Sequence, residues 1–338
     1  MKNLFFFKQS DTIFLRITMD SIEQIIISKG RRFLFAVETS SQPEDYLKYE
    51  ELRDEIWEDP EDHMSGTGIL ANKNYFNNGS CLFLGIFSEA ENGGFIKNKQ
   101  NLIAFSLGYV GVKDKEIGFR KSGNLAFYSQ YAAVRPDFRN YNLAVMLKEF
   151  QRDKVLNVLG VDVILCTYDP LTGINAYRNI HKFGMDVLAY KESYYTDFTG
   201  KYNRADVPCD RLCMTWDLKG NIKRPSYELV GLLESDCNVI VSKFITFTGP
   251  SGELELPVVK DLRLNNDGEF LLIEIPFDFY SMLHATAVED PNIRNIPVEW
   301  RMKTREAFSV LFQRGYKIID FRFLEYKGRA REFYILRR

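Results

Sequence analysis

The chain has 338 residues, of which 45% are hydrophobic, and phenylalanine is unusually common with 27 copies. This length exceeds that of one typical domain, and the composition supplies enough apolar side chains for a large core. The formal net charge is −2, which excludes the basic excess that accompanies non-specific nucleic-acid binding. We therefore expect a folded protein without a nucleic-acid partner.

The cysteines and histidines indicate neither a disulfide framework nor a metal site. Five cysteines, an odd number, include no Cys-x-x-Cys pair, and only three histidines are present. The apolar run Leu4 to Phe7 is too short for a signal-peptide core, and no run of 18 apolar residues occurs. The sequence therefore predicts a cytoplasmic protein without a membrane partner, and it leaves open a homodimer.

Residues 1–40 are expected to form an N-terminal addition of a strand, a helix and a strand. Two β-rich runs, Thr12 to Thr18 and Arg32 to Glu38, flank a short apolar stretch from Ile22 to Ile27. After a junction at residues 40–43, Pro43 stands where helices begin, and apolar residues recur at helical spacing up to Trp57. A helix is therefore predicted to end near Trp57.

Further elements follow from the same kinds of pattern. A second short helix is expected within Ser65 to Asn77, and a hairpin is expected from strands at 81–88 and 101–112 around Gly93-Gly94. Nearer the C-terminus, strands are predicted at 238–247, 270–275, 316–323 and 332–336, with a helix at 298–314 that ends before Gly315.

The most informative stretch is residues 131–144, where an apolar strand (125–134) enters a turn that contains two arginines. The turn opens directly into a helix predicted at 143–158, and a further strand is predicted at 162–168. The first backbone N–H groups of a helix have no intrahelical partner and lie at the positive end of its dipole. They form a ready site for a phosphate or diphosphate, so the sequence predicts a phosphorylated cofactor.

The residues Arg139-Asn140-Tyr141-Asn142-Leu143-Ala144 resemble the pyrophosphate loop of the Gcn5-related N-acetyltransferase superfamily. That family's pattern is Gln/Arg-x-x-Gly-x-Gly/Ala. Arg139 and Ala144 match the pattern, whereas Asn142 stands in place of the usual glycine. Asparagine is the non-glycine residue that most readily takes a positive φ, and it keeps its N–H group.

The order of the surrounding parts is also similar to that of the superfamily. Asn175-Ala176 stands at a predicted helix start, and Lys182-Phe183-Gly184 closes that helix. A bacterial group of predicted acetyltransferases in this superfamily, which has a C-terminal extension, is similar in further motifs. These motifs are Cys166-Thr167-Tyr168-Asp169-Pro170-Leu171, Tyr194-Tyr195, Pro208-Cys209-Asp210-Arg211-Leu212, Trp216, Glu274-Ile275-Pro276, Trp300-Arg301, Arg305-Glu306-Ala307-Phe308 and Gly315-Tyr316.

The resemblance implies an α/β (α+β) acyl-CoA N-acyltransferase fold, which is a mixed, mostly antiparallel sheet flanked by helices. It implies three parts: the addition at 1–40, an acetyltransferase domain at 41–220 and a C-terminal α+β domain at 221–338. The implied reaction transfers an acyl group, most simply acetyl, from acetyl-CoA to an unidentified amine acceptor in a direct ternary complex. No metal takes part, and the acceptor site would lie on the loops at 59–78 and 192–207.

The same resemblance assigns cofactor contacts by residue. The pantetheine arm would pair with the strand edge near Ala132 and Val134, and Asn175 would bind the arm or cap its own helix. The diphosphate would be held by the loop residues Arg139, Asn140, Tyr141, Asn142, Leu143 and Ala144. Arg135 is a second candidate for a phosphate contact.

The usual catalytic residues of the superfamily are absent. The central strand, Phe127 to Tyr131, has no glutamate to act as base, and Ile180 stands at the place of the usual tyrosine acid. Tyr194 and Tyr195 are candidates to protonate the thiolate. Tyr128 and Gln130 should share one face of their strand and could orient an acceptor. His181 is expected on an exposed helix face.

Three other functions stay open at this point. The missing glutamate and tyrosine are compatible with a non-catalytic protein that binds acyl-CoA. The donor could instead be a longer acyl-CoA or an aminoacyl-tRNA, although the nearly neutral charge argues against tRNA. A purely structural role is the third alternative. The identity of the acceptor, the acyl length and the general base do not follow from the sequence.

Overall fold

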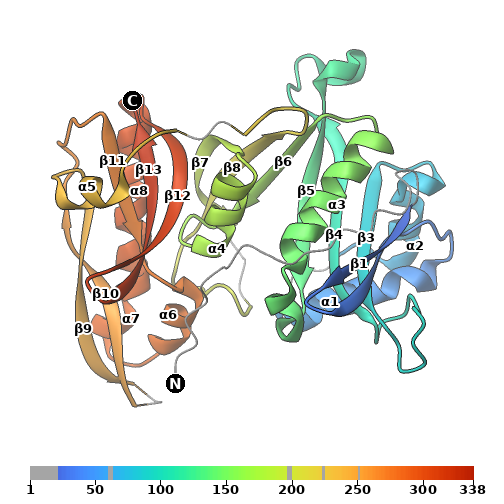
Figure 1. The fold of residues 1–338 in the computed structure, drawn as a ribbon, viewed down its shortest axis with the longest axis horizontal. Coiled ribbons are helices and arrows are strands. Elements are labelled where there is room, and N and C mark those ends of the chain that lie inside the picture. The colour runs from blue at the N-terminus through green and yellow to red at the C-terminus, as the bar shows by residue number, and fades with distance from the viewer. Residues whose placement is uncertain (1–21, 60–63, 196–199, 223–224, 250–251) are drawn as a thin grey trace. The chain divides into compact units, whose positions relative to one another are not determined.

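The computed structural model describes residues 22–59, 64–195, 200–222, 225–249 and 252–338. The chain forms two compact units, one ending at Asp162 and one beginning at Val163, and their elements are labelled in Figure 1. Among the described residues, no helix is both long and apolar enough to cross a membrane.

The described residues of the first unit form one antiparallel sheet and three α-helices. Its strands pair in the order β1-β2-β3-β4-β5. They are β1 (Glu23–Ser28), β2 (Arg31–Val37), β3 (Cys81–Ser88), β4 (Leu102–Val112) and β5 (Leu125–Val134), and the helices are α1 (Leu47–Trp57), α2 (Thr67–Lys73) and α3 (Leu143–Asn157). The predicted helix after Pro43 is confirmed, since a 3-10 turn at Pro43–Tyr46 leads into α1.

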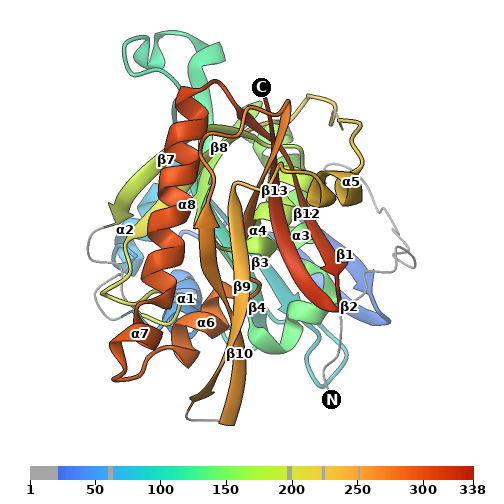
Figure 2. The ribbon, with the colours of Figure 1, turned by 90° about the vertical axis from the view of Figure 1, so that its left-hand side faces the viewer.

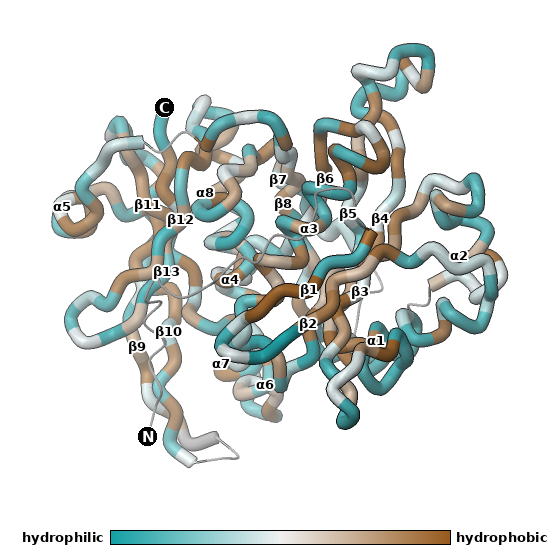
Figure 3. Tube along the Cα trace, turned by 45° about the vertical axis from the view of Figure 1, so that its right-hand side comes forward, coloured by the Kyte–Doolittle hydropathy of each residue, from teal (hydrophilic) through white to brown (hydrophobic). Residues whose placement is uncertain are grey.

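The helix expected from Ile22 to Ile27 is wrong, because these residues lie in and next to β1, which pairs with β2. The connecting residues Lys29 and Gly30 both have positive φ, 50° and 77°, as in the tight turns that join hairpin strands. Branched isoleucines at 25–27, which form a brown segment in Figure 3, favour the extended backbone. The strand predicted at Thr12 to Thr18 lies outside the described residues.

Helices α1 and α3 cover opposite faces of this sheet. Phe105 of β4 contacts the rings of Tyr49 and Trp57 from α1, at centroid distances of 6.0 and 6.3 Å. The next residue, Ser106, accepts a hydrogen bond of 2.5 Å from the side chain of Gln151 in α3. Because neighbouring residues of a strand point to opposite faces, the sheet is packed on both sides.

The described part of the second unit contains three antiparallel groups of strands, with the pairings β6-β8-β7, β10-β9 and β11-β13-β12. Its strands are β6 (Val163–Tyr168), β7 (Asp186–Tyr195), β8 (Cys209–Asp217), β9 (Ile240–Gly249), β10 (Gly252–Leu262), β11 (Phe270–Ile275), β12 (Lys317–Tyr326) and β13 (Arg329–Arg337). Its helices are α4 (Gly173–Ala176), continued by a π-helical turn at Tyr177–Lys182, α5 (Leu229–Glu234), α6 (Phe279–Ala285), α7 (Pro291–Arg294) and α8 (Ile296–Gln313).

The fold class expected from the sequence is confirmed: mostly antiparallel sheets are flanked by helices, and extra sheets and helices follow β8. The predicted C-terminal helix corresponds to α8, which lies alongside the strands of its unit in Figure 2. Trp300 of α8 donates its indole N–H to the Pro257 carbonyl in β10 at 2.9 Å. Strand β10 and helices α5 to α7 were not predicted.

Buried ion pairs connect α8 to the strands that precede residue 220. Arg301 contacts the Asp169 carboxylate at 2.5 Å, and both side chains are almost fully buried. Arg305 binds both oxygens of the buried Asp210, with N–O distances of 2.6 and 2.9 Å. The second unit therefore extends across residue 220, and the division at residues 40 and 220 stays a prediction.

Glu332 of β13 is a buried carboxyl group that forms no ion pair with a described residue. Its exposed fraction is 4%, and its Oε2 atom has no hydrogen-bond partner among the described residues. It lies against Gly173, where an added Cβ would be 1.7 Å from Oε2. Burial, with a smaller effect from Asp278, raises the pKa of Glu332 to about 8.

We predict that Glu332→Gln removes a pH dependence of stability. Because the folded-state pKa exceeds the ordinary value, the folded protein binds more protons between pH 4.5 and pH 8. Its free energy of unfolding should therefore fall by a few kcal/mol as pH rises through this window. Urea unfolding at pH 5 and pH 8.5 should show this fall in wild type and not in Glu332→Gln. The exposed Glu325→Gln serves as control, and equal pH slopes for all three proteins would contradict the assignment.

Candidate functional site

Strand β5 contains one residue more than the part of β4 that it faces. Leu107 pairs with Tyr131 and Gly108 pairs with Ser129, so Gln130 forms a β-bulge. A Cβ on Gly108 would lie 2.4 Å from both the Phe127 ring and the Tyr128 carbonyl oxygen. Glycine at residue 108 therefore allows β5 to bend closely over β4 at the bulge.

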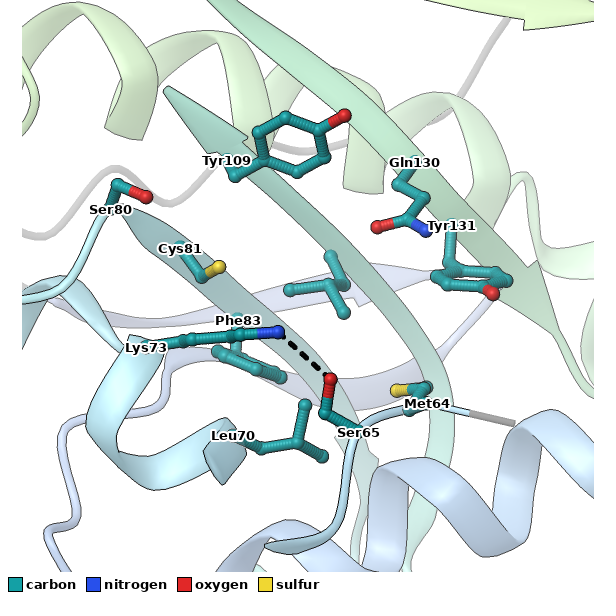
Figure 4. Close-up of a pocket in the computed structure, with 11 residues that line it drawn as sticks. Met64, Ser65, Leu70, Lys73, Ser80, Cys81, Phe83, Tyr109, Gln130 and Tyr131 are labelled. Carbon is teal, nitrogen blue, oxygen red and sulfur yellow. Dashed lines mark hydrogen bonds between the residues drawn. The ribbon is translucent and has the colours of Figure 1, made fainter. Parts of the chain in front are cut away.

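A pocket of about 380 Å³ opens at the bulge, and Figure 4 shows the side chains around it. All of its described lining residues belong to the first unit, and four of them come from the stretch 59–78, which the sequence predicts to border the acceptor. They are Met64, Ser65, Leu70, Lys73, Ser80, Cys81, Phe83, Leu107, Tyr109, Gln130 and Tyr131. The pocket therefore combines an apolar floor with hydroxyl, amide and ammonium groups.

Lys73 is the one cationic side chain among the described lining residues. Its ammonium group donates a hydrogen bond of 2.8 Å to the Ser65 hydroxyl, as the dashed line in Figure 4 shows. Burial raises the pKa of the nearby Cys81 thiol, and the positive charge of Lys73 opposes this effect. The thiol is therefore mostly protonated near neutral pH and is not set up as a nucleophile.

A buried polar network supports the bulge from the opposite face of the sheet. The Lys148 ammonium in α3 donates to the Ser129 hydroxyl and to the Gln151 amide oxygen, both at 2.9 Å. The amide nitrogen of Gln151 continues the network to Ser106. Ser129 and Ser106 lie on the adjacent strands β5 and β4, so the network links these strands to α3 next to Gln130.

The bulge changes which residues of β5 reach the pocket. Tyr128, predicted to share a face with Gln130, packs on the ring of Tyr109 with a centroid distance of 5.4 Å, and Gln130 lines the pocket. Tyr131 also lines it, although strict alternation along a strand would place it opposite Gln130. Sequence reasoning missed Tyr131, and the small Gly108 was the one available signal for a bulge.

The predicted diphosphate loop has the expected backbone. A 3-10 turn at Pro136–Tyr141 ends at Asn142, whose φ is 59° and ψ is 18°, and α3 begins at the next residue. The left-handed conformation expected of Asn142 is thus observed. Among the described residues, neither the Leu143 nor the Ala144 amide donates to a protein acceptor, so two N–H groups at the start of α3 are available.

The β1–β2 hairpin supports this loop. The Ser28 hydroxyl donates to the Tyr141 carbonyl oxygen at 2.8 Å, and the Tyr141 ring packs edge-on against Phe33 at 5.4 Å. The Arg31 guanidinium lies 5.3 Å from the centre of the Tyr141 ring. Of the two arginines in the loop, Arg135 contacts Glu55 at 3.0 Å.

The backbone N–H groups of Ala132 and Val134 in β5 point away from β4. The Arg135 N–H group donates to the Ile103 carbonyl of β4, and backbone groups alternate in direction along a strand. The N–H groups of Ala132 and Val134 therefore point to the edge of β5 opposite β4. The Val134 carbonyl accepts from Arg139 Nε at 3.4 Å, and Ala132 is exposed.

The remaining predicted residues belong to the second unit. The Asn175 side-chain oxygen accepts a hydrogen bond of 2.6 Å from Arg178. Tyr194 and Tyr195 are exposed and pack perpendicular to each other at 4.8 Å. The exposed position expected for His181 is wrong, because its Nδ1 atom lies 2.7 Å from Asp320 and its side chain is only 13% exposed. Asp320 lies on β12, far away in sequence.

No family model and no curated protein sequence matches the chain. Similar solved structures are acetyltransferases of the superfamily that the sequence resembles. NAA60 of Arabidopsis thaliana in complex with acetyl-CoA has 12% identity and a TM-score of 0.41 over 56% of this chain and 99% of its own. The ribosomal-protein-S18-alanine N-acetyltransferase of Escherichia coli has 13% identity and a TM-score of 0.37, covering 57% and 99%.

A GNAT-family acetyltransferase of Streptococcus pneumoniae has 11% identity and a TM-score of 0.38, with coverage of 54% of this chain and 98% of its own. TM-scores of this size do not establish an activity for this chain. Its activity is therefore inferred from its own residues. Those residues form a pocket at a β-bulge and a loop that presents free amides at the start of a helix.

We predict that Asn142→Ala destabilises the protein, whereas Asn142→Gly does not strain the turn. The left-handed conformation is roughly 1 kcal/mol unfavourable for alanine, whereas glycine adopts it without steric strain. The free energy of unfolding in urea should therefore fall for Asn142→Ala and stay close to wild type for Asn142→Gly. Asn140→Ala, two residues earlier in the loop, serves as control. An Asn142→Ala protein as stable as wild type would show that the turn carries no such strain.

Proposed function

We propose that the protein is an acyl-CoA-dependent N-acyltransferase, most simply one that transfers acetyl from acetyl-CoA to an amine. The observation that carries this proposal is the left-handed backbone of Asn142 directly before α3. The next two amides, of Leu143 and Ala144, have no acceptor among the described residues. Two convergent N–H groups at the positive end of a helix of 15 residues suit the diphosphate of coenzyme A. Arg139, from the same loop, is proposed to add a charged contact.

The rest of the donor is proposed to follow β5 from this loop to the bulge. The outward backbone groups of Ala132 and Val134 would pair with the pantetheine amides as an added strand does. Small side chains at residues 132 and 133 permit a close approach. This path brings the thioester next to Gln130, where the bulge leaves backbone groups without partners in β4. Such groups can stabilise the oxygen of a tetrahedral intermediate.

The acceptor amine is proposed to enter the pocket that Gln130 and Tyr131 line. Its nitrogen attacks the thioester carbon, the C–N bond forms, and the C–S bond breaks. The amine loses one proton and the leaving thiolate gains one. Gln130 can orient the amine, and the Tyr131 hydroxyl can exchange the protons. Tyr194 and Tyr195 stay candidates for protonating the thiolate, and Asn175 stays a candidate for the cofactor arm.

The alternative is a protein that binds acyl-CoA without catalysis. It is favoured by one observation, which is that no carboxylate lies among the described residues of the pocket lining. A direct attack then has no strong general base next to the amine. Binding of acetyl-CoA without turnover on a broad panel of amines would support this alternative.

We predict that Ala144→Glu weakens coenzyme A binding at least about tenfold without loss of stability. A carboxylate in the first turn of α3 interacts favourably with the helix dipole, but it repels a diphosphate bound at the same place. Ala144→Gln is the matched neutral control and should bind nearly as wild type does. Isothermal titration with coenzyme A measures the affinities, and thermal unfolding measures the stability. Equal affinities for the two variants would place the diphosphate elsewhere, and no binding by wild type would overturn the proposal.

We predict that Tyr131→Phe reduces acetyl transfer about a hundredfold, because proton transfer by a positioned side chain typically contributes at least that factor. Release of free thiol from acetyl-CoA, measured with an amine panel, reports the rate. Tyr194→Phe and Tyr195→Phe are tested in parallel as the alternative acids. A Tyr131→Phe enzyme with the wild-type rate, beside a slow tyrosine variant at 194 or 195, would move the role to the second unit.

A further inference from the structure

The described residues of the pocket lining carry a positive charge. Lys73 is its one ionised residue among the described lining, and the other polar groups are the hydroxyls of Ser65, Ser80, Tyr109 and Tyr131 and the amide of Gln130. Lys73 bonds to the uncharged Ser65 hydroxyl, and within the described part of the chain it forms no ion pair. An ammonium group that points into a pocket and has no carboxylate partner among the described residues favours an anionic ligand.

We propose that the acceptor is a small primary amine that also carries a carboxylate, as amino acids do, and that Lys73 binds this carboxylate. This inference rests on the proposed acyltransferase function. Ser65, which already contacts Lys73, would provide a second donor. The reacting amine would then lie on the side of Gln130 and Tyr131, across the pocket from Lys73, as Figure 4 shows.

The size of the pocket and its apolar floor further restrict the class of acceptor. A volume of about 380 Å³ lies near the lower limit of ligand pockets, which span roughly 300–1,000 Å³. The floor consists of the apolar side chains of Met64, Leu70, Phe83 and Leu107. An amino acid with an aliphatic side chain such as leucine fits both features.

The same charge argues against a polyamine acceptor. A second ammonium group in the pocket would meet Lys73 without a described carboxylate to separate them, and like charges at short range repel. For a single amine the charge is helpful, because a nearby cation favours the neutral amine that attack requires. Lys73 thus selects the acceptor by its carboxylate and disfavours one with several cationic groups.

The test measures binding of reaction products to the protein loaded with coenzyme A, so that it does not depend on turnover. The probes are N-acetyl-leucine, its analogue N-(3-methylbutyl)acetamide, which lacks the carboxylate, and N-acetylspermidine. Wild type should bind N-acetyl-leucine at least about tenfold more tightly than either of the others. Lys73→Met should lose this preference, and Lys115→Met, an exposed lysine outside the lining, should keep it.

The outcomes separate this inference from the proposed function. No preference in wild type, an unchanged preference in Lys73→Met, or tighter binding of N-acetylspermidine would overturn the carboxylate assignment. In each of these cases a normal titration with coenzyme A alone would leave the acyltransferase proposal standing. Absence of coenzyme A binding would remove both. Lys73 is exposed, so the variant should fold, and a melting temperature equal to that of wild type verifies this.

Discussion

The pocket depends on one geometric constraint, which is that β5 has one residue more than the part of β4 it pairs with. Gln130 is accommodated because Gly108 has no side chain where β5 crosses closely over β4. On the opposite face, the hydrogen bond from Lys148 to Ser129 ties the strand to α3. With both sides held, Gln130 and Tyr131 point to the same pocket although they are neighbours in sequence.

The same strand carries the second part of the proposed site. The loop that ends at Asn142 follows β5 directly, so the distance between loop and bulge is set by the strand itself. Five residues from Gln130 to Arg135 span roughly 16 Å at 3.3 Å per residue. An extended donor with its diphosphate at α3 would therefore present its far end to the pocket. Support of the loop comes from the β1–β2 hairpin through Ser28 and Phe33.

The second unit is organised by buried charged groups. Asp169 and Asp210 are each matched by an arginine of α8, which joins the segment before residue 220 to the segment after it. A buried ion pair is costly unless it is well bonded, and breaking one partner is more costly still. Glu332 is the exception, since no described cation pairs with it and burial raises its pKa. The two arginine contacts thus link residues on either side of residue 220.

The sequence by itself determined the order of strands and helices through local patterns such as the apolar alternation of β5 and the Pro43 start of α1. It also determined the loop before α3, because the positive φ of Asn142 is a property of that residue and its neighbours. Only tertiary structure decided the bulge, which arises from a mismatch between two strands. It likewise brought together Lys73, Gln130 and Tyr131 in one pocket and paired His181 with Asp320, since residues far apart in sequence meet only after the strands are paired.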